Sequence, residues 1–175
     1  MCGAEYALRD GVAWLTSDGR VERPEAPGAP TDPMRVAALL GLGDPAARVM
    51  LCGEYGSAAA ALESAMGVRC LVVNAPSGSA IDALSDHFVA ENSRAIPLAN
   101  GSLHGVAVDD AHATWLADVA RVVRVGGRVV APSHAPVPKG CRELARDDQE
   151  WVAEVEPAVS VSALTRLTRG RSTGT

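Results

Sequence analysis

The sequence predicts an α/β protein with a doubly wound, mostly parallel sheet. One observation is that short apolar runs alternate with helical patterns between residues 49 and 131. A second is the stretch Val49–Ser57, where an apolar run stops at Gly53, bends through Gly56 and leads into an Ala-rich segment. This pattern is typical of a buried parallel strand that feeds a helix. Such turns lie at the edge where open α/β sheets bind ligands.

Composition and charge exclude several classes of protein. The 175 residues are enough for one well-buried core but not for two ordinary domains. A net charge of −5 argues against a nucleic-acid partner, because it provides no basic surface. No apolar run approaches the roughly 18 residues of a membrane span, and the N-terminus does not resemble a signal peptide. We therefore expect a cytoplasmic protein that binds neither nucleic acid nor membrane.

The four cysteines give no sign of a metal centre. They are Cys2, Cys52, Cys70 and Cys141, and no two are close in sequence. This spacing supports neither a disulfide framework nor a zinc site, so no metal-binding residue is predicted. Cys52 and Cys70 lie within apolar, strand-like runs, and we expect them to be small buried hydrophobic residues.

Residues 1–23 are predicted to form a small β-meander. Two Asp-Gly pairs, Asp10-Gly11 and Asp18-Gly19, suit two-residue hairpin turns and define three short strands. A Pro-rich linker follows at residues 24–33. Residues 34–168 form the α/β domain and residues 169–175 a disordered tail.

The α/β domain opens with a helix whose ends are marked in the sequence. Thr31 or Asp32 caps it, with Pro33 at the first position. The helix is expected to stop around Gly41–Gly43. Further helices are predicted at residues 57–66, 78–86, 111–123 and 139–148.

The predicted strands of the domain alternate with these helices. They lie at residues 49–52, 69–74, 94–98, 103–108 and 128–131. Gly126 and Gly127 are predicted to end the helix that precedes the last of them. Residues 151–155 and 160–167 alternate with period two, which predicts a terminal antiparallel hairpin added to the parallel sheet.

Two phrases carry a resemblance to a known family. Residues 96–108, Ile-Pro-Leu-Ala-Asn-Gly-Ser-Leu-His-Gly-Val-Ala-Val, resemble the Leu-Pro-Phe-x-Asp-x-Ser-Phe-Asp-x-Val phrase of class I S-adenosylmethionine-dependent methyltransferases. Residues 116–130, Leu-Ala-Asp-Val-Ala-Arg-Val-Val-Arg-Val-Gly-Gly-Arg-Val-Val, resemble the family's Glu-x-x-Arg-Val-Leu-Arg-Pro-Gly-Gly signature. The resemblance covers residues 33–167 and implies a class I methyltransferase-like fold.

The N-terminal stretch has a resemblance of its own. Residues 1–15 are similar to half of the small zinc ribbon of methyltransferase activators, where a Cys-x-x-Cys-Gly knuckle precedes Tyr and Asp-Gly. Only Cys2 of that knuckle is present. Either the metal has been lost or the knuckle starts upstream of Met1. The alternative is a hairpin with no relation to a metal site.

The family resemblance implies a site for S-adenosylmethionine at the carboxyl ends of the strands. The residues that it assigns to the cofactor are Gly53, Glu54, Tyr55, Gly56, Asn74, Asn92, Ser93 and Asp109. In the family, glycines after the first strand let the backbone approach the methionine part of the cofactor. An acid after the second strand accepts from both ribose hydroxyls, and another lies beside the adenine ring.

This chain departs from the family at those acids and glycines. The three family acids fall at Leu51, Asn74 and Asn92. If each lost charge-assisted hydrogen bond contributes about 1.5–3 kcal/mol, their replacement removes several decades of affinity. Tyr55 stands at the second glycine position and blocks close approach unless Gly56 supplies the bend.

Asp109, Asp110 and His112 are the candidate catalytic residues, because they follow a strand at its carboxyl end. A His beside two carboxylates is able to act as a general base. The alternative is that Asp109 or Asp110 caps the following helix, with His112 exposed in its first turn.

Three functions remain open from the sequence. The first is S-adenosylmethionine-dependent methyl transfer to an unknown acceptor. The second is a catalytically inactive methyltransferase-fold protein that acts as a partner or scaffold subunit, with a protein partner or a second copy of itself. Short connections and the lack of an inserted acceptor-binding lid favour the second. The third is a nucleotide-binding module that uses the same crevice.

Overall fold

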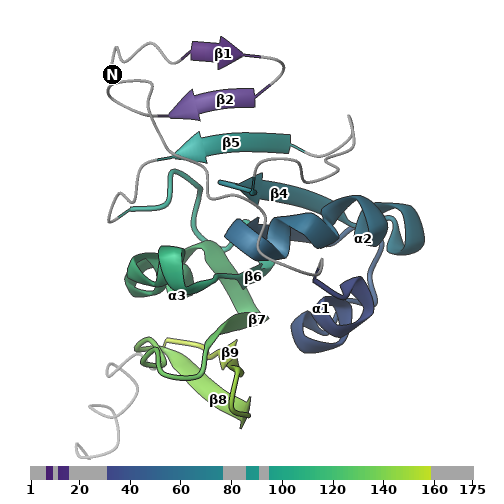
Figure 1. Cartoon of the computed structure of the whole chain (residues 1–175). Coiled ribbons are helices and arrows are strands. Elements are labelled where there is room, and N and C mark those ends of the chain that lie inside the picture. The colour runs from purple at the N-terminus through teal and green to yellow at the C-terminus, as the bar shows by residue number, and fades with distance from the viewer. Residues whose placement is uncertain (1–6, 10–11, 16–30, 77–85, 91–94, 159–175) are drawn as a thin grey trace, which may run out of the picture.

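The computed structural model describes residues 7–9, 12–15, 31–76, 86–90 and 95–158. Within these residues, nine strands form one sheet in the order β1-β2-β5-β4-β3-β6-β7-β9-β8 (Figure 1). The strands are β1 (Ala7–Arg9), β2 (Val12–Leu15), β3 (Arg48–Cys52), β4 (Arg69–Val73), β5 (Asp86–Ala90), β6 (Leu103–Ala107), β7 (Val123–Pro132), β8 (Cys141–Arg146) and β9 (Glu150–Val155). The helices are α1 (Pro33–Leu40), α2 (Ala59–Met66) and α3 (Leu116–Val122), with 3₁₀ segments at Gly53–Ala58 and Asp110–Trp115.

The sheet is doubly wound and mostly parallel, as predicted. The six strands from β2 to β7 in the sheet order pair in parallel. β9 and β8 extend the sheet beyond β7 as an antiparallel pair. From the central strand β3 the chain passes outward to β4 and β5, and then returns to β6 and β7 on the other side. This reversal between β3 and β6 is the point at which open α/β sheets bind ligands.

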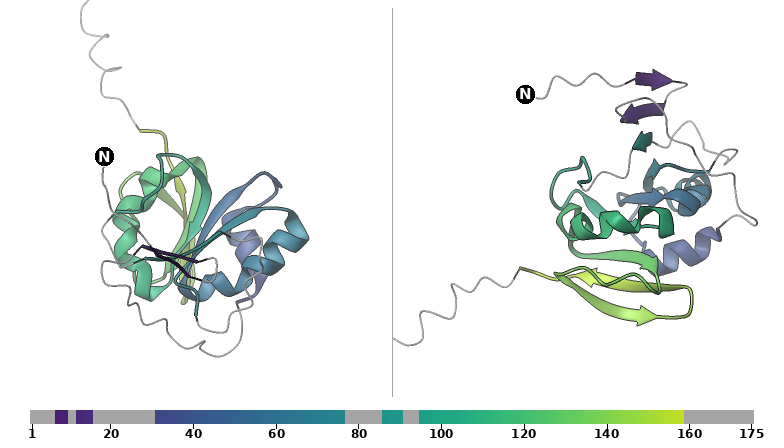
Figure 2. Two further views of the ribbon diagram at one scale, coloured as in Figure 1. Left: turned by 90° about the horizontal axis from the view of Figure 1, so that it is seen from above. Right: turned by 60° about the vertical axis from the view of Figure 1, so that its left-hand side comes forward.

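Helices cover both faces of the sheet. Figure 2 shows α1 and α2 on one face and α3 on the other. β3 is buried on both sides: Val49 and Leu51 belong to the cluster beneath α1 and α2, while Met50 and Cys52 belong to the cluster that contains Trp115 and α3. A strand covered on both faces needs a continuous apolar run, which is how β3 was predicted.

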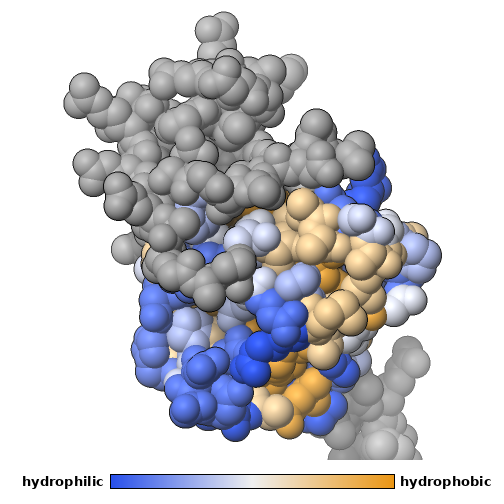
Figure 3. Space-filling model, turned by 45° about the vertical axis from the view of Figure 1, so that its right-hand side comes forward, coloured by the Kyte–Doolittle hydropathy of each residue, from blue (hydrophilic) through white to orange (hydrophobic). Residues whose placement is uncertain are grey.

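The outward surface of α1 and α2 is rich in apolar residues. Figure 3 shows apolar colours gathered over these two helices. Met34 on α1 is 63% exposed, and α2 begins with three consecutive alanines. Of the helices in the described ranges, none is long and apolar enough to cross a membrane.

α1 begins and ends where the sequence predicts. Asp32 is its N-cap, and the Asp32 carboxylate accepts the Met34 N–H at 2.9 Å. Pro33 takes the first helical position, and Gly41 ends the helix with a left-handed φ of 63°. Thr31, just before the cap, bonds to the turn that follows β3. These bonds hold Thr31 and Asp32 beside that turn.

The strand predicted at residues 94–98 is wrong, because residues 95–98 form bends and coil. Side chains of α3 satisfy the main-chain groups of this segment. The Asp118 carboxylate accepts the Ile96 N–H at 2.8 Å, and the Arg121 guanidinium donates to the carbonyl oxygens of Ile96 and Leu98, both at 2.7 Å. With these groups bonded, the segment needs no strand partner.

The strand next to β4 is β5, which the sequence prediction missed. Most of the helix predicted at residues 78–86 lies outside the described residues, and Asp86 begins β5 instead. β5 pairs in parallel with β4 on one side and with β2 on the other. β5 forms because β4 and β2 provide main-chain hydrogen-bond partners for it, and these long-range partners cannot be predicted from the local sequence. The β1–β2 hairpin thus extends the sheet past β5, while the third strand of the predicted meander lies outside the described residues.

The helix predicted at residues 139–148 is also wrong, because β8 occupies Cys141–Arg146. A terminal antiparallel hairpin exists as predicted, but β8 and β9 form it. Pairing with β9 overrides the helical preference of Arg-Glu-Leu-Ala-Arg, and Arg142 makes a cross-strand ion pair with Glu154 at 3.3 Å. The strand predicted at residues 160–167 lies outside the described residues.

The helix predicted at residues 111–123 starts as a 3₁₀ segment and becomes α-helical only at Leu116. It ends before the Gly126–Gly127 pair, since β7 begins at Val123. A Cβ atom at Gly127 would lie 2.6 Å from the His104 carbonyl oxygen. Gly127 is therefore required by the close approach of β7 to β6, and the pair does not end the helix as predicted.

Candidate functional site

The carboxyl ends of β3, β4, β6 and β7 meet along one side of the sheet, which we call the carboxyl edge. Gly53 directly follows β3, Asn74 follows β4, and Asp109 lies two residues beyond β6. In the sheet order, β3 lies between β4 and β6. Asn74 and Asp109 consequently stand on either side of the end of β3.

The turn after β3 is closed by Asp109. Gly53 has a φ of 57°, a left-handed conformation that suits glycine, and it makes the bend itself. The Glu54 N–H donates to Asp109 Oδ2 at 3.1 Å. A Cβ atom on Gly53 would overlap the Asp109 carboxylate. The carboxylate of Asp109 therefore rests directly against the backbone of the turn.

A hydrogen-bonded relay of three side chains crosses the end of β3. His112 Nδ1 bonds to Asp109 Oδ1, and His112 Nε2 lies 2.9 Å from Asn74 Nδ2. With the amide nitrogen of Asn74 donating to Nε2, the imidazole carries its proton on Nδ1 and donates it to Asp109. His112 is 3% exposed and Asn74 is 6% exposed. We call this set the Asn74–His112–Asp109 relay.

The relay decides between the two sequence interpretations of this segment. Asp109 is the N-cap of the 3₁₀ segment, since its side chain accepts the His112 N–H at 3.2 Å. His112, however, is buried, so its predicted exposure is wrong. The tight 3₁₀ turn brings the His112 ring under Asp109 and within 5.3 Å of the Trp115 ring. Both ring nitrogens are already bonded, which leaves neither free to act as a general base.

Gly56 serves packing and does not supply the predicted alternative bend. It is absent from the residues with positive φ. A Cβ atom there would lie 2.8 Å from Val72 Cγ1 and 3.0 Å from Ala75 Cβ. Glycine at this position lets the turn lie close to the end of β4.

Tyr55 faces the β9 side of the carboxyl edge. Its hydroxyl donates to Glu150 Oε2 at 2.5 Å, at the start of β9. Burial, together with the bond to Glu150, raises the pKa of Tyr55, so the phenol stays protonated as a donor. Arg35 on α1 donates to Glu150 Oε1 at 2.7 Å and to Asp147 Oδ2 at 3.0 Å. This network joins α1, the turn after β3 and the β8–β9 connection.

A cleft of about 510 Å³ opens at the carboxyl edge, between α1, the turn after β3, the end of β7 and the start of β9. We call it the carboxyl-edge cleft. Its walls are Thr31, Asp32, Arg35, Val36, Leu39, Glu54, Tyr55, Asp109, Asp110, Ala111, Pro132, Gln149 and Glu150. Four residues singled out from the sequence, Glu54, Tyr55, Asp109 and Asp110, thus meet in one cavity. Asn74 is close to Asp109 through the relay but does not line the cleft.

Other predicted residues fall outside this arrangement. Asn92 and Ser93 lie outside the described residues. Cys52 and Cys70 are buried as predicted, and burial raises the pKa of Cys70 to about 12. Within the described ranges, His, Cys, Asp and Glu side chains form no group of three or more that could hold a metal ion.

Sequence reasoning missed Arg35 and Glu150. Glu150 is 115 residues from Arg35, and neither residue belongs to a local motif. Arg35 has the pattern of an ordinary exposed helix residue, and Glu150 was assigned no role. Only the pairing of β9 with β7, and the packing of α1 over the sheet, bring them together.

No family model and no curated protein matches the sequence. Solved structures match at low identity. One is a chain of the Haloferax volcanii complex that contains the Trm112 methyltransferase activator, with 18% identity, a TM-score of 0.45, and coverage of 56% of this chain and 49% of that one.

Two further matches have similar values. Geranyl diphosphate C-methyltransferase from Streptomyces coelicolor, in complex with Mg²⁺, geranyl-S-thiolodiphosphate and S-adenosyl-L-homocysteine, shows 17% identity and a TM-score of 0.46, over 57% of this chain and 41% of that one. The cyclase SpnF shows 12% identity and a TM-score of 0.46, over 57% and 42%. The matched part of this chain spans less than half the length of each of the three.

Proposed function

We propose that this chain is a methyltransferase-like domain that acts as a partner or scaffold subunit and does not use S-adenosylmethionine. The proposal rests on the Asn74–His112–Asp109 relay. The relay lies across the end of β3, where the sequence resemblance assigns the cofactor. His112 bonds to both Asn74 and Asp109, and His112 and Asn74 are buried on the edge that a cofactor would have to cover, with Asp109 partly exposed.

The residues at the ribose position do not fit the cofactor. The resemblance expects a carboxylate after β4 that accepts from both ribose hydroxyls. Asn74 is uncharged, and its amide is engaged with His112 at 2.9 Å. Turning Asn74 toward a ribose would leave His112 buried with one nitrogen unbonded, which carries a desolvation penalty of about 1–3 kcal/mol.

The residues at the methionine position do not fit either. The resemblance expects bare backbone after β3 for close approach. Here the Asp109 carboxylate covers Gly53 and accepts the Glu54 N–H. A methionine carboxylate at this place would meet a like charge within a few ångströms. At both the ribose and the methionine positions, the chain's own side chains thus occupy the groups that the cofactor would contact.

The β1–β2 hairpin supports a role in assembly. β2 pairs in parallel with β5 and extends the sheet. The same stretch resembles half of a methyltransferase activator. We infer that the chain would contact a partner through this hairpin.

S-adenosylmethionine-dependent methyl transfer is the alternative, and the carboxyl-edge cleft favours it. The cleft adjoins Glu54 and Tyr55, and about 510 Å³ is enough for a small molecule. The difference between the two functions is whether the cofactor displaces Asp109 and His112 from the end of β3.

Calorimetric titration with S-adenosylmethionine and S-adenosylhomocysteine, up to millimolar ligand, tests the proposal. Wild type is expected to release no binding heat. Asp109→Ala removes the carboxylate over Gly53, and it should bind more tightly than wild type if the relay is the obstacle. Micromolar binding by the wild type would overturn the proposal, and acceptors should then be screened.

A further inference from the structure

We infer that the carboxyl-edge cleft binds a cationic group on an apolar stem, an alkylammonium or an alkylguanidinium. This inference is independent of the proposed function. It follows from the size of the cleft, the apolar and acidic residues that line it, and the hydrogen bonds that its carboxylates can still accept. The expected cofactor does not contribute to it, and of the relay only Asp109 does, as one of the carboxylates that line the cleft.

The cleft is a cavity with an apolar wall. Its volume of about 510 Å³ lies within the range of small-molecule sites, about 300–1,000 Å³. Val36 and Leu39 on α1, with Ala111 and Pro132 opposite, supply this wall. Val36 is buried beneath the surface, while Leu39 is partly exposed. An alkyl stem would displace water from these side chains and gain hydrophobic burial.

The charge of the lining selects a cation. The carboxylates are Asp32, Glu54, Asp109, Asp110 and Glu150, and Arg35 is the one guanidinium among the lining residues. Arg35 is itself neutralised, because it bonds to Glu150 and to Asp147. The field in the cleft is therefore negative, and an anionic ligand would meet repulsion from most sides.

The carboxylates deeper in the cleft, Glu150 and Asp109, already accept hydrogen bonds from the protein with all their oxygens. Both oxygens of Glu150 accept bonds, one from Arg35 and one from Tyr55. Both oxygens of Asp109 accept as well, from Glu54 N–H and from His112. Glu150 is only 8% exposed, so this inner part is a fixed floor.

The carboxylates at the rim of the cleft, Asp32 and Glu54, can still accept hydrogen bonds from a ligand. Asp32 accepts the Met34 N–H with one oxygen. Among the described residues, the Glu54 side chain makes no hydrogen bond or ion pair. An ammonium or guanidinium at the mouth of the cleft would gain charge-assisted bonds from these two groups. The apolar stem would point toward Leu39 and Pro132.

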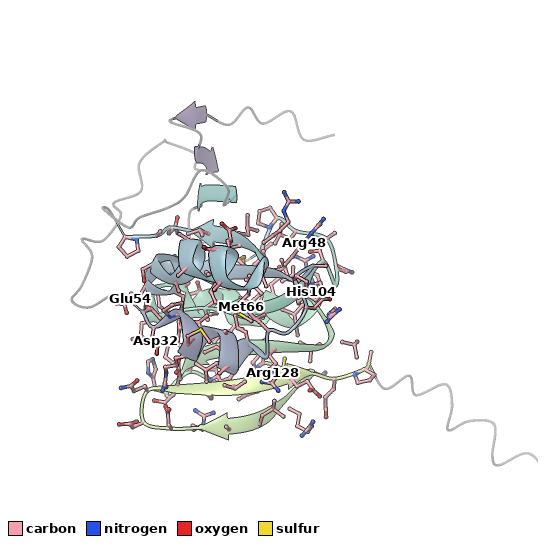
Figure 4. All side chains as sticks on the ribbon, turned by 90° about the vertical axis from the view of Figure 1, so that its right-hand side faces the viewer. Asp32, Arg48, Glu54, Met66, His104 and Arg128 are labelled. Carbon is pink, nitrogen blue, oxygen red and sulfur yellow. The ribbon has the colours of Figure 1, made fainter. Side chains whose placement is uncertain are left out.

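Thr31 joins the two main-chain segments that carry the rim carboxylates. Its hydroxyl donates to the Glu54 carbonyl oxygen at 3.1 Å, and its N–H donates to Ser57 Oγ, also at 3.1 Å. Thr31 directly precedes Asp32 in the chain, so it links the N-cap of α1 to the turn after β3. Figure 4 shows Asp32 and Glu54 on the same edge of the molecule. Because these segments are already joined, binding has to order only the side chains at the rim and not the main chain.

Titrations monitored by calorimetry and by amide NMR shifts test the inference. The probes are hexylammonium, hexanol as the neutral analogue and hexanoate as the anionic one. Hexylammonium is expected to bind at least about tenfold more tightly than either analogue and to lose affinity as NaCl rises. Shifts should centre on residues 31–39, 54–55 and 149–150. Equal binding of hexanoate, or no binding of hexylammonium at millimolar concentration, would overturn the inference.

Asp44 provides a matched control for Asp32. Each Asp precedes a proline and accepts the N–H two residues onward, at 2.9 Å for Asp32 and 2.8 Å for Asp44. Asp44 lines a different hollow. Asp32→Asn keeps the cap, yet it should weaken hexylammonium binding about fivefold, and Glu54→Gln should do the same. Asp44→Asn should leave binding unchanged; an equal loss there would refute the cleft as the site.

Two sources could supply such a cation, a free amine or a side chain of a protein partner. The peptides acetyl-Gly-Lys-Gly-amide and acetyl-Gly-Arg-Gly-amide, titrated in the same way, distinguish them. Tighter binding of a peptide than of hexylammonium assigns the site to a basic side chain, and the reverse assigns it to a free amine. Either order supports a cation site if Asp32→Asn weakens the tighter probe.

Discussion

The two edges of the sheet use polar side chains in different ways. At the amino edge, where strands begin, an arginine bonds to main chain: Arg128 donates to the carbonyl oxygens of Ala38 and Leu39 at 3.2 and 3.3 Å. At the carboxyl edge, side chains bond to side chains in the relay and around Glu150. In Figure 4, Glu54 lies at one side of the molecule, Arg48 and His104 lie at the other, and Arg128 lies between them.

This difference separates groups that the fold requires from groups that indicate a site. The last carbonyls of a helix need donors in any protein, so the fold alone explains Arg128. Nothing in the fold requires Tyr55, Glu150 and Arg35 to meet. Partly buried ionic networks add little net stability compared with apolar packing. These groups are concentrated at the edge where we propose the ligand site.

Replacing Gly53 should disrupt the turn after β3 and cause the largest loss in the free energy of unfolding. In Gly53→Ala the new methyl group overlaps the Asp109 carboxylate, and alanine must also adopt a φ near 57°. We expect a loss of about 3 kcal/mol in the free energy of unfolding, measured with urea.

Gly43 is the control for Gly53, because it lies outside that edge and nothing is within 4 Å of a Cβ atom there. Gly43→Ala should change the free energy of unfolding by less than about 0.5 kcal/mol. Equal effects of the two variants would mean that Asp109 does not rest on the turn.

Removing His112 should break the relay itself. His112→Ala leaves a cavity beside Trp115 and takes away the shared partner of Asn74 and Asp109. We expect a loss of about 2–3 kcal/mol in the free energy of unfolding, from the lost packing and the unbonded polar groups. Chemical denaturation followed by tryptophan fluorescence measures it.

His134 is the matched histidine, because its contact with Asp110 at 3.1 Å joins two side chains that are each more than 70% exposed. His134→Ala is expected to be nearly neutral. If His134→Ala destabilises the protein as much as His112→Ala, the relay has no special part in the fold.

Local pattern was sufficient for the elements in the middle of the sheet. β3 could be predicted because its apolar run is long enough for a strand covered on both faces, and α1 because Asp32, Pro33 and Gly41 mark its ends. The prediction failed where tertiary contacts replace local preference. Residues 95–98 look like a strand, but α3 satisfies their main-chain groups, and β8 looks helical until it pairs with β9.

The candidate site was predictable only in part. Gly53, Glu54 and Tyr55 came from the family resemblance, whereas Asp109 was singled out because it follows a strand, and such positions share one edge in a parallel sheet. The bond between Asn74 and His112 could not be found, since it depends on a 3₁₀ turn that reverses the expected exposure of His112. Sequence patterns report periodicity along an element, whereas this site depends on contacts across several.

Arg128 tests the other side of the comparison. Arg128→Met keeps the alkyl stem but removes the donors to the end of α1. We expect a loss of about 1 kcal/mol in the free energy of unfolding, typical of a lost helix cap. Arg124→Met is the control, because within the described residues its guanidinium makes no hydrogen bond or ion pair. Equal losses would show that charge alone, and not the cap, explains Arg128.

The smallest expected effect concerns Asp118, which holds Arg121 in place for its bonds to the main chain. The Asp118 carboxylate accepts from Arg121 Nε and Nη2, both at 2.6 Å. These bonds hold the pKa of Asp118 below its ordinary value of 3.8. Because the folded pKa is the lower one, this carboxylate stabilises the fold above about pH 4. The contribution disappears as pH falls through the folded pKa.

Asp118→Asn isolates that contribution, since every other carboxylate titrates in both proteins. Urea unfolding at several pH values should show the wild type more stable by about 0.5 kcal/mol at pH 7, with the difference shrinking toward zero near pH 2. A difference that stays constant down to pH 2 would contradict this account. In that case most of the stability from Asp118 would come from its hydrogen bond to the Ile96 N–H, which needs no charge. Asp118 would then act, like Arg128, by bonding to main chain.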